Sequence, residues 1–285
     1  MNQNKKRTII YVSITLVITW LMIGIIPLTG HTYGDGFSLM LISGCMFIPT
    51  IGNILTRLIT RQGFQEFKLA PHFKGNGKVY LFSYFIIPIL IIVGTVFYFL
   101  IFRQNFSLQD SAAAKSLQTA GMSMSVWTYL LICIIISPVV NIIATLGEEI
   151  GWRGYLLYQL KEEHGTVKAI LLTGVIWGIW HAPMIALGHN YGTAYPGYPV
   201  LGILVMIIWC TILGIIEGYV TIKSGSVIPA AICHSGVNGL ASIGMMFFVG
   251  TPLPIVGPIF CGVIPMIPAC VFAVLLLLKM KKGNM

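Results

Sequence analysis

The chain has 285 residues, of which 56% are hydrophobic and only 9% are charged. With a mean hydropathy of +0.88, it is too apolar for a soluble globular domain of ordinary composition. Its formal charge of +9 would suit a nucleic-acid partner on composition alone, so the placement of the charges has to decide.

Apolar runs long enough to cross a bilayer recur along the whole chain. A hydrocarbon core about 30 Å thick needs about 20 mostly apolar residues per helix. The predicted spans are 8–28, 37–56, 79–102, 126–147, 168–187, 199–221, 226–248 and 255–278, with the fourth continuing as helix past Tyr155. We therefore expect an all-α, polytopic membrane protein of about eight transmembrane helices, forming a single integral membrane domain over residues 1–285.

The N-terminus has the basic start of a signal peptide. Its apolar run is too long for one, however, and lacks an A-x-A-like cleavage site, so we interpret it as an uncleaved first helix.

Basic residues gather on one side of the predicted spans. With the N-terminus in the cytoplasm, only Arg103 and Lys115 fall outside, and an odd number of spans would destroy this asymmetry. The cytoplasmic set is Lys5, Lys6, Arg7, Arg57, Arg61, Lys68, Lys74, Lys78, Arg153, Lys161, Lys168, Lys223, Lys279, Lys281 and Lys282. The positive charge thus reflects membrane topology. We expect a multi-pass protein of the cell membrane, with both termini cytoplasmic and no nucleic-acid partner.

All six cysteines lie inside apolar runs and show no paired ligand spacing such as C-x-x-C. We interpret them as small hydrophobic residues in helix packing.

The stretch "TLGEEIGWRGYLLYQL" places two carboxylates and an arginine at the end of the fourth span. On a helix, Glu149 and Arg153 are one turn apart on one face, which favours an ion pair. Glu148 is then left without this partner and is available for general acid or base work. The alternative is a solvated helix end with ordinary surface charge.

The next span contains "GVIWGIWHAPMIALG", with His181 about 20 Å from its cytoplasmic end. Trp177 lies one turn before His181 on the same face, and Pro183 just after it weakens the helix. Alone, such a histidine would most often only bond a neighbouring helix.

The seventh span contains "SVIPAAICHSGVNGL", in which His234 and Asn238 are again one turn apart. Glu148, His181 and His234 have similar expected depths, and ionisable groups inside a bilayer are usually functional. Glycine pairs at four-residue spacing would let the helices approach closely. These pairs are Gly147 and Gly151, Gly174 and Gly178, and Gly214 and Gly218. The three motifs predict one shared site.

Together, E-E-x-x-x-R, aromatic-x-x-x-H and H-x-x-x-N, in this order on separate helices, resemble the CAAX protease and bacteriocin-processing family. These are intramembrane endopeptidases related to the type II CAAX prenyl endopeptidase. The resemblance covers the helical core, residues 126–245, and includes the lead-in "TIKSGSVIPAAICH". Trp177 departs from the commoner phenylalanine but keeps the ring. Glu217 is outside the three motifs. It either lines the same cavity or lies near the cytoplasmic end within reach of water, and we favour the second position.

The resemblance implies hydrolysis of membrane-embedded or lipidated peptide substrates near the cytoplasmic membrane face. It implies Glu148 as the general base and His181 as a residue that holds the water. His234 and Asn238 would donate to the oxyanion. The side chains of Glu149, Arg153 and Trp177 would hold these residues in position.

The cofactor stays open. Glu148, His181 and His234 would also form a two-histidine, one-glutamate zinc set. Because Asn238 beside His234 suits oxyanion donation better than ligation, we favour a metal-independent reaction and keep Zn²⁺ as the alternative.

Two other functions compete with proteolysis. Intramembrane glutamate and histidine also occur in proton-coupled or small-molecule transporters, although no matching interrupted helices in two halves are seen. A non-catalytic bacteriocin-immunity protein on the same fold is the other. The choice between prenylated CAAX proteins and bacteriocin-like peptides as substrates, and the oligomeric state, have no signal in the sequence.

Overall fold

The computed structural model describes residues 3–109, 115 and 125–282, and within these ranges it contains helices and no strands. The helices are α1 (Gln3–Leu28), α2 (Gly36–Cys45), α3 (Ile48–Ile59), α4 (Gly77–Ile101), α6 (Val126–Val140), α7 (Ile142–Gly151), α8 (Leu157–His164), α9 (Thr166–Trp180), α10 (Ala182–Ala186), α11 (Val200–Ser224), α12 (Ile228–Leu240) and α13 (Met266–Lys282). Two 3₁₀ turns, η1 (Arg103–Asn105) and η3 (Ile243–Phe247), and one π-helical turn, η2 (Trp152–Leu156), complete them. The expected all-α fold is confirmed.

The protein is a multi-pass membrane protein, and its helices can be compared with the eight expected spans. Within the described residues, five helical segments are long and apolar enough to cross a membrane, and up to seven if two bent helix pairs each count as one span. The eighth expected span is shorter than predicted, because α13 begins at Met266 rather than near residue 255. Pro252, Pro254, Pro258 and Pro265 precede it, and each proline removes a helical hydrogen bond, so together they disfavour a helix over this stretch.

The second expected span is bent between α2 and α3. The two helices meet at an angle of 41° around Met46 and Phe47. Pro49 occupies the first turn of α3, where its missing N–H does no harm, but it cannot donate to a continuous helix.

The fourth expected span is bent by 46° at Asn141, between α6 and α7. The helix then continues to His164, as predicted, with η2 between α7 and α8. In η2 the N–H of Leu157 bonds to the carbonyl of Trp152, five residues back, which makes this turn wider than an α-helical one.

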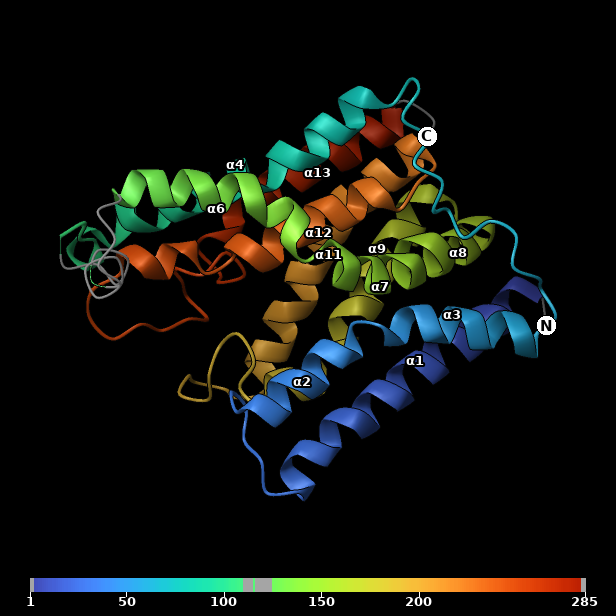
Figure 1. Cartoon of the computed structure of the whole chain (residues 1–285), viewed down its shortest axis with the longest axis horizontal. Coiled ribbons are helices and arrows are strands. Elements are labelled where there is room, and N and C mark those ends of the chain that lie inside the picture. The colour runs from blue at the N-terminus through green and yellow to red at the C-terminus, as the bar shows by residue number, and fades with distance from the viewer. Residues whose placement is uncertain (1–2, 110–114, 116–124, 283–285) are drawn as a thin grey trace.

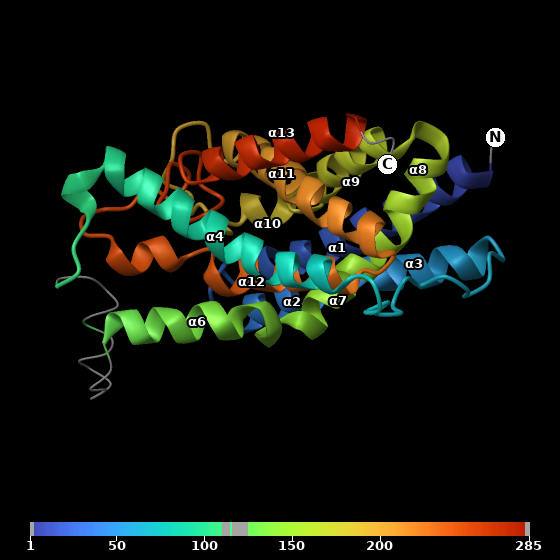
Figure 2. The same cartoon turned by 90° about the horizontal axis from the view of Figure 1, so that it is seen from above.

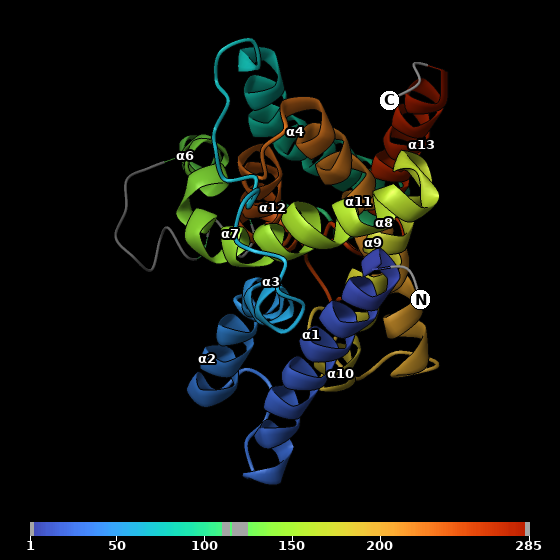
Figure 3. The ribbon, with the colours of Figure 1, turned by 90° about the vertical axis from the view of Figure 1, so that its right-hand side faces the viewer.

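Helix α12 lies at the centre of the bundle, against α4, α6, α7 and α11, and α9 packs along α11. Figures 1 and 3 show α1, α2 and α3 on one side of this core and α4 and α13 on the other.

The glycine pairs at four-residue spacing lie at close helix contacts, as expected. A Cβ atom at Gly174 would lie 2.6 Å from Cα of Thr211, and one at Gly214 would lie 3.2 Å from Cα of Gly174. Only glycine allows α9 and α11 to approach this closely. Gly151 makes the corresponding contact between α7 and Pro49 of α3.

The two marked chain ends lie on the same side of the bundle in Figures 1 and 2. The segment between α3 and α4 is at this end too, because Val227 N–H donates to the Lys68 carbonyl and the Asn76 amide donates to the Ser224 carbonyl. Basic residues occur in the last turns of α3, α11 and α13. Both marked chain ends and several basic helix ends thus lie at one end of the bundle.

Candidate active site

Helix α7 carries the two adjacent carboxylates, and their side chains point into different surroundings. Successive residues on a helix differ by about 100° in direction, so Glu148 and Glu149 cannot face the same partners. Both side chains are buried. Glu148 lines a cavity, whereas Glu149 faces a group of charged residues from η2, α11 and α12.

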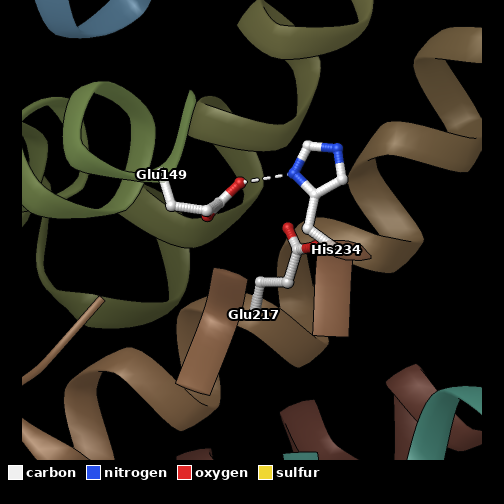
Figure 4. A group of neighbouring side chains, drawn as sticks. All are labelled: Glu149, Glu217 and His234. Atoms are coloured by element: carbon white, nitrogen blue, oxygen red, sulfur yellow. Dashed lines mark hydrogen bonds and ion pairs between the residues drawn. The ribbon is translucent and has the colours of Figure 1, made fainter. Parts of the chain in front are cut away.

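Glu149 accepts from two donors. Its Oε1 atom lies 2.9 Å from Nη1 of Arg153, which confirms the predicted ion pair, and 2.9 Å from Nδ1 of His234. Because an ionised carboxylate only accepts hydrogen bonds, Nδ1 of His234 carries a proton in this contact. Figure 4 shows this bond, with Glu149 and His234 approaching from different helices.

Arg153 is fully buried. Its guanidinium spans two carboxylates, with Nη2 only 2.6 Å from Oε2 of Glu217. It also lies over the Trp177 ring, with Cζ 4.3 Å from the ring centroid. Burial without these partners would be very unfavourable for a cation.

The expectation that Glu217 reaches water is wrong. This residue is completely buried in α11 and lies beside His234 and Glu149, as Figure 4 shows. A buried carboxylate needs a compensating charge, and Arg153 provides it across the helix interface.

Two tryptophans fix the orientation of Glu148. Oε2 of Glu148 accepts a hydrogen bond of 2.8 Å from the Trp177 indole and one of 3.3 Å from the Trp152 indole. Its other oxygen, Oε1, lies 3.9 Å from Nε2 of His234. Sequence reasoning missed Trp152, although its four-residue spacing from Glu148 is the signal that pairs Glu149 with Arg153.

His181 caps the C-terminal end of α9, where Pro183 forces the break before α10. Its Nδ1 atom is 2.9 Å from the Trp177 carbonyl, an acceptor, so Nδ1 donates and Nε2 is left as the acceptor. Cys210 of α11 lies beside the same ring, with Sγ 3.6 Å from Nδ1. Sequence reasoning treated Cys210 only as a packing residue.

A cavity of about 290 Å³ collects the predicted catalytic side chains from three helices. Glu148 of α7, His181 at the end of α9, and His234 and Asn238 of α12 all line it. Trp177, Trp180, Met184, Met206, Trp209 and Leu213 provide much of the remaining wall. The cavity therefore combines polar groups from several helices with apolar and aromatic walls.

The donor atoms can also be tested as a metal site. The nitrogen and carboxylate oxygen atoms of Glu149, Glu217 and His234 lie within 4.8 Å of one another. The corresponding atoms of Glu148, His181 and His234 do not form such a group. Arg153 already contacts both carboxylates of the first set. Two carboxylates that share a guanidinium are satisfied by an ion pair, so neither set favours zinc.

Residues 126–240, which include α7, α9, α11 and α12, match the family model "Type II CAAX prenyl endopeptidase Rce1-like". This part of the chain is therefore similar to the Rce1-like family.

A curated relative agrees with the Rce1-like match. "CAAX prenyl protease 2" of Methanococcus maripaludis is 31% identical over 98 residues. The match covers 34% of this chain and 36% of the relative, so it spans about a third of each protein.

Proposed function

We propose that the chain is an intramembrane endopeptidase that hydrolyses peptide bonds of membrane-associated or lipidated substrates. The observation that carries this proposal is the shared cavity of Glu148, His181, His234 and Asn238. The match of residues 126–240 to the Rce1-like family model supports it.

Glu148 acts as the general base. Both indole donors bind its Oε2, which leaves Oε1 to accept a proton from water. The 3.9 Å between Oε1 and Nε2 of His234 is short enough for a single water molecule to bond to both atoms. Proton transfer from this water to Oε1 would generate the attacking hydroxide.

His181 holds the water from another side. With its Nδ1 proton directed to the Trp177 carbonyl, its Nε2 atom can accept a hydrogen bond but cannot donate one in the neutral ring. That role suits positioning of a nucleophilic water.

His234 and Asn238 stabilise the oxyanion. Glu149 at Nδ1 supports a positive imidazolium, whose Nε2–H would donate to the developing negative charge together with the Asn238 amide. The ion pair with Arg153 holds Glu149 in position for this task. The proton on Glu148 then passes to the leaving amine.

Prenylated C-terminal peptides are the first substrate class to test, because the curated relative is named a prenyl protease. Bacteriocin-like peptides are the second class. We place the enzyme in the cell membrane with both termini cytoplasmic, since both chain ends and many basic helix ends share one side of the bundle.

The decisive experiment compares the wild type with Glu148→Gln in proteoliposomes. Each is incubated with a prenylated tetrapeptide-ended substrate and with a set of unprenylated peptides, and the cleavage products are identified by mass spectrometry. Loss of the base should lower kcat by about 10²- to 10⁴-fold. Glu162→Gln, at an exposed position of α8, is the matched control and should behave as the wild type.

Cleavage by Glu148→Gln at the wild-type rate would rule out the proposed base. Absence of cleavage of every peptide by the wild type, together with solute movement across the proteoliposome membrane, would instead favour a transporter. Absence of both activities would favour an immunity protein.

A further inference from the structure

Helices α4, α11 and α13 enclose a groove of about 450 Å³ at the end of the bundle where the chain termini lie. It is separate from the catalytic cavity, and the two share no lining residue. Its lining is Lys78, Val79, Phe82, Tyr219, Lys223, Phe272, Leu275, Leu276 and Lys279.

Three lysines from three different helices converge on this groove. Lys78 lies in the first turn of α4, and Lys223 and Lys279 lie in the last turns of α11 and α13. All three are exposed, no acidic residue lines the groove, and none of the three forms an ion pair with another described residue. A concentration of unpaired positive charge is repulsive unless an anion relieves it.

Below the lysines the groove is apolar and aromatic. The Phe82 ring stacks on Phe272, with centroids 6.2 Å apart, and meets the edge of Tyr219 at the same centroid distance. Leu275 is exposed beside them. The groove thus presents cations at its outer end and hydrocarbon-compatible surface along its length.

We propose that this groove is a binding site for one anionic phospholipid. Its phosphate lies among Lys78, Lys223 and Lys279, and an acyl chain lies along Phe82, Phe272 and Leu275. Basic pockets between transmembrane helices at the cytoplasmic side recognise anionic headgroups in this way. A free phosphate would use the lysines but leave the apolar surface uncovered, and a zwitterionic lipid would leave the charge unrelieved.

A bound lipid would connect three helices that are distant in sequence. Tyr219 and Lys223 line the groove, whereas Glu217, two residues before Tyr219 on α11, pairs with Arg153 on the opposite side of that helix. Occupancy should therefore raise the thermal stability of the bundle whether or not the chain is a protease.

The test uses the full chain, delipidated in detergent. Phosphatidylglycerol, phosphatidylcholine or inorganic phosphate is added, and lipid retention by native mass spectrometry and the melting temperature are measured. We expect the wild type to retain one phosphatidylglycerol and to show a higher melting temperature with it. Phosphatidylcholine and phosphate should have little effect.

The groove variant is Lys78→Gln with Lys223→Gln and Lys279→Gln. The control, Lys5→Gln with Lys6→Gln and Lys74→Gln, removes the same charge at the same end without touching the groove. The groove variant should bind phosphatidylglycerol about tenfold or more weakly, from the usual contribution of a lysine near an anionic lipid surface. The control should bind as the wild type does.

Equal weakening in both triple variants, or equal binding of the two lipids by the wild type, would overturn the proposal. A melting-temperature increase with inorganic phosphate equal to that with phosphatidylglycerol would reduce the groove to a simple anion site and also overturn it. If the groove triple does not fold, the single Lys279→Gln decides, with an expected loss of about threefold or more.

Discussion

Oε2 of Glu217 lies 2.6 Å from Nη2 of Arg153, while Nη1 of the same arginine lies 2.9 Å from Glu149. Glu149 in turn accepts from His234. A residue outside the three motifs thus anchors the arginine that holds the carboxylate behind a proposed catalytic histidine. Glu217 is separated from the cavity by this chain of contacts, so it is a positioning residue.

Replacing Glu217 with glutamine should therefore weaken both stability and activity without abolishing either. The variant keeps the shape but removes one of two anions facing Arg153, and Glu149 then carries the whole ion pair. We expect a loss of about 1 to 3 kcal/mol in stability, measured as thermal unfolding in detergent. A pH–rate profile should shift relative to the wild type, because the charge near His234 has changed. Glu162→Gln should alter neither measurement, and an unchanged profile for Glu217→Gln would refute the positioning role.

Arg153→Ala should be the most damaging change in this network. It leaves Glu149 and Glu217 buried together without a cation, at a cost of about 3 to 5 kcal/mol. Arg153→Lys should recover part of the stability but little activity, since one ammonium cannot reproduce the two-sided contact. Thermal unfolding and cleavage rates of the two variants, measured side by side, check this order. Equal stability of Arg153→Ala and the wild type would contradict the buried network.

Trp177→Phe isolates the indole hydrogen bond to Glu148. The ring can still lie over Arg153, but the 2.8 Å donor to Oε2 is lost and only the longer bond from Trp152 remains. We expect kcat to fall by about tenfold, the usual worth of a hydrogen bond to a charged group, with KM nearly unchanged. Trp127→Phe, at an exposed tryptophan of α6, is the control. A lower melting temperature with an unchanged kcat would assign Trp177 to packing alone.

Gly174→Ala tests the contact between α9 and α11. The added Cβ would lie 2.6 Å from backbone Cα of Thr211, which cannot rotate away as a side chain could. We expect destabilisation by about 1 to 3 kcal/mol through forced separation of the helices. Gly24→Ala in α1 meets no atom within 4 Å and should be neutral or slightly stabilising, because alanine favours helix. Thermal unfolding of the two variants gives the comparison.

Chelation should leave peptide cleavage intact. The proposed reaction uses Glu148 as a base, and Arg153 already satisfies Glu149 and Glu217. The measurement is activity of untagged protein before and after prolonged dialysis against a chelator, with metal content determined in parallel. Stoichiometric zinc, with activity lost on its removal and restored on its return, would recast His181 and His234 as ligands.

The parts of the site that were predictable from the sequence follow from spacing within single helices. Glu149 with Arg153 and Trp177 with His181 are each one turn apart, so geometry along one helix relates them without knowledge of the fold. Glu217 has no charged residue one turn away on α11, and its partner comes from another helix. No local pattern contains such a contact.

Some helix boundaries were likewise predictable from the sequence, and others were not. Gly225 ends α11 with a φ of 71°, and Pro229 lies in the first turn of α12, so this junction was predictable within a few residues. The bends at Phe47 and Asn141 were missed, because hydropathy stays high through both positions while the helix direction changes. Hydropathy reports how long a chain segment stays in apolar surroundings and carries no information about its direction.

The π-helical turn at Trp152–Leu156 sets the rotational phase between the two halves of one long helix. Before this turn, Glu148 lines the cavity, and near the C-terminal end of the turn the Tyr155 hydroxyl donates to Gln62 of the segment between α3 and α4. An ordinary α-helical turn closes with one residue fewer, so the wide turn takes up one extra residue between Glu148 and the end of the helix. A continuous α-helix of the same sequence would place everything beyond this point about 100° further round. Tyr155 would then lose Gln62, or Glu148 would leave the cavity, so the wide turn is what allows one helix of this sequence to make both contacts.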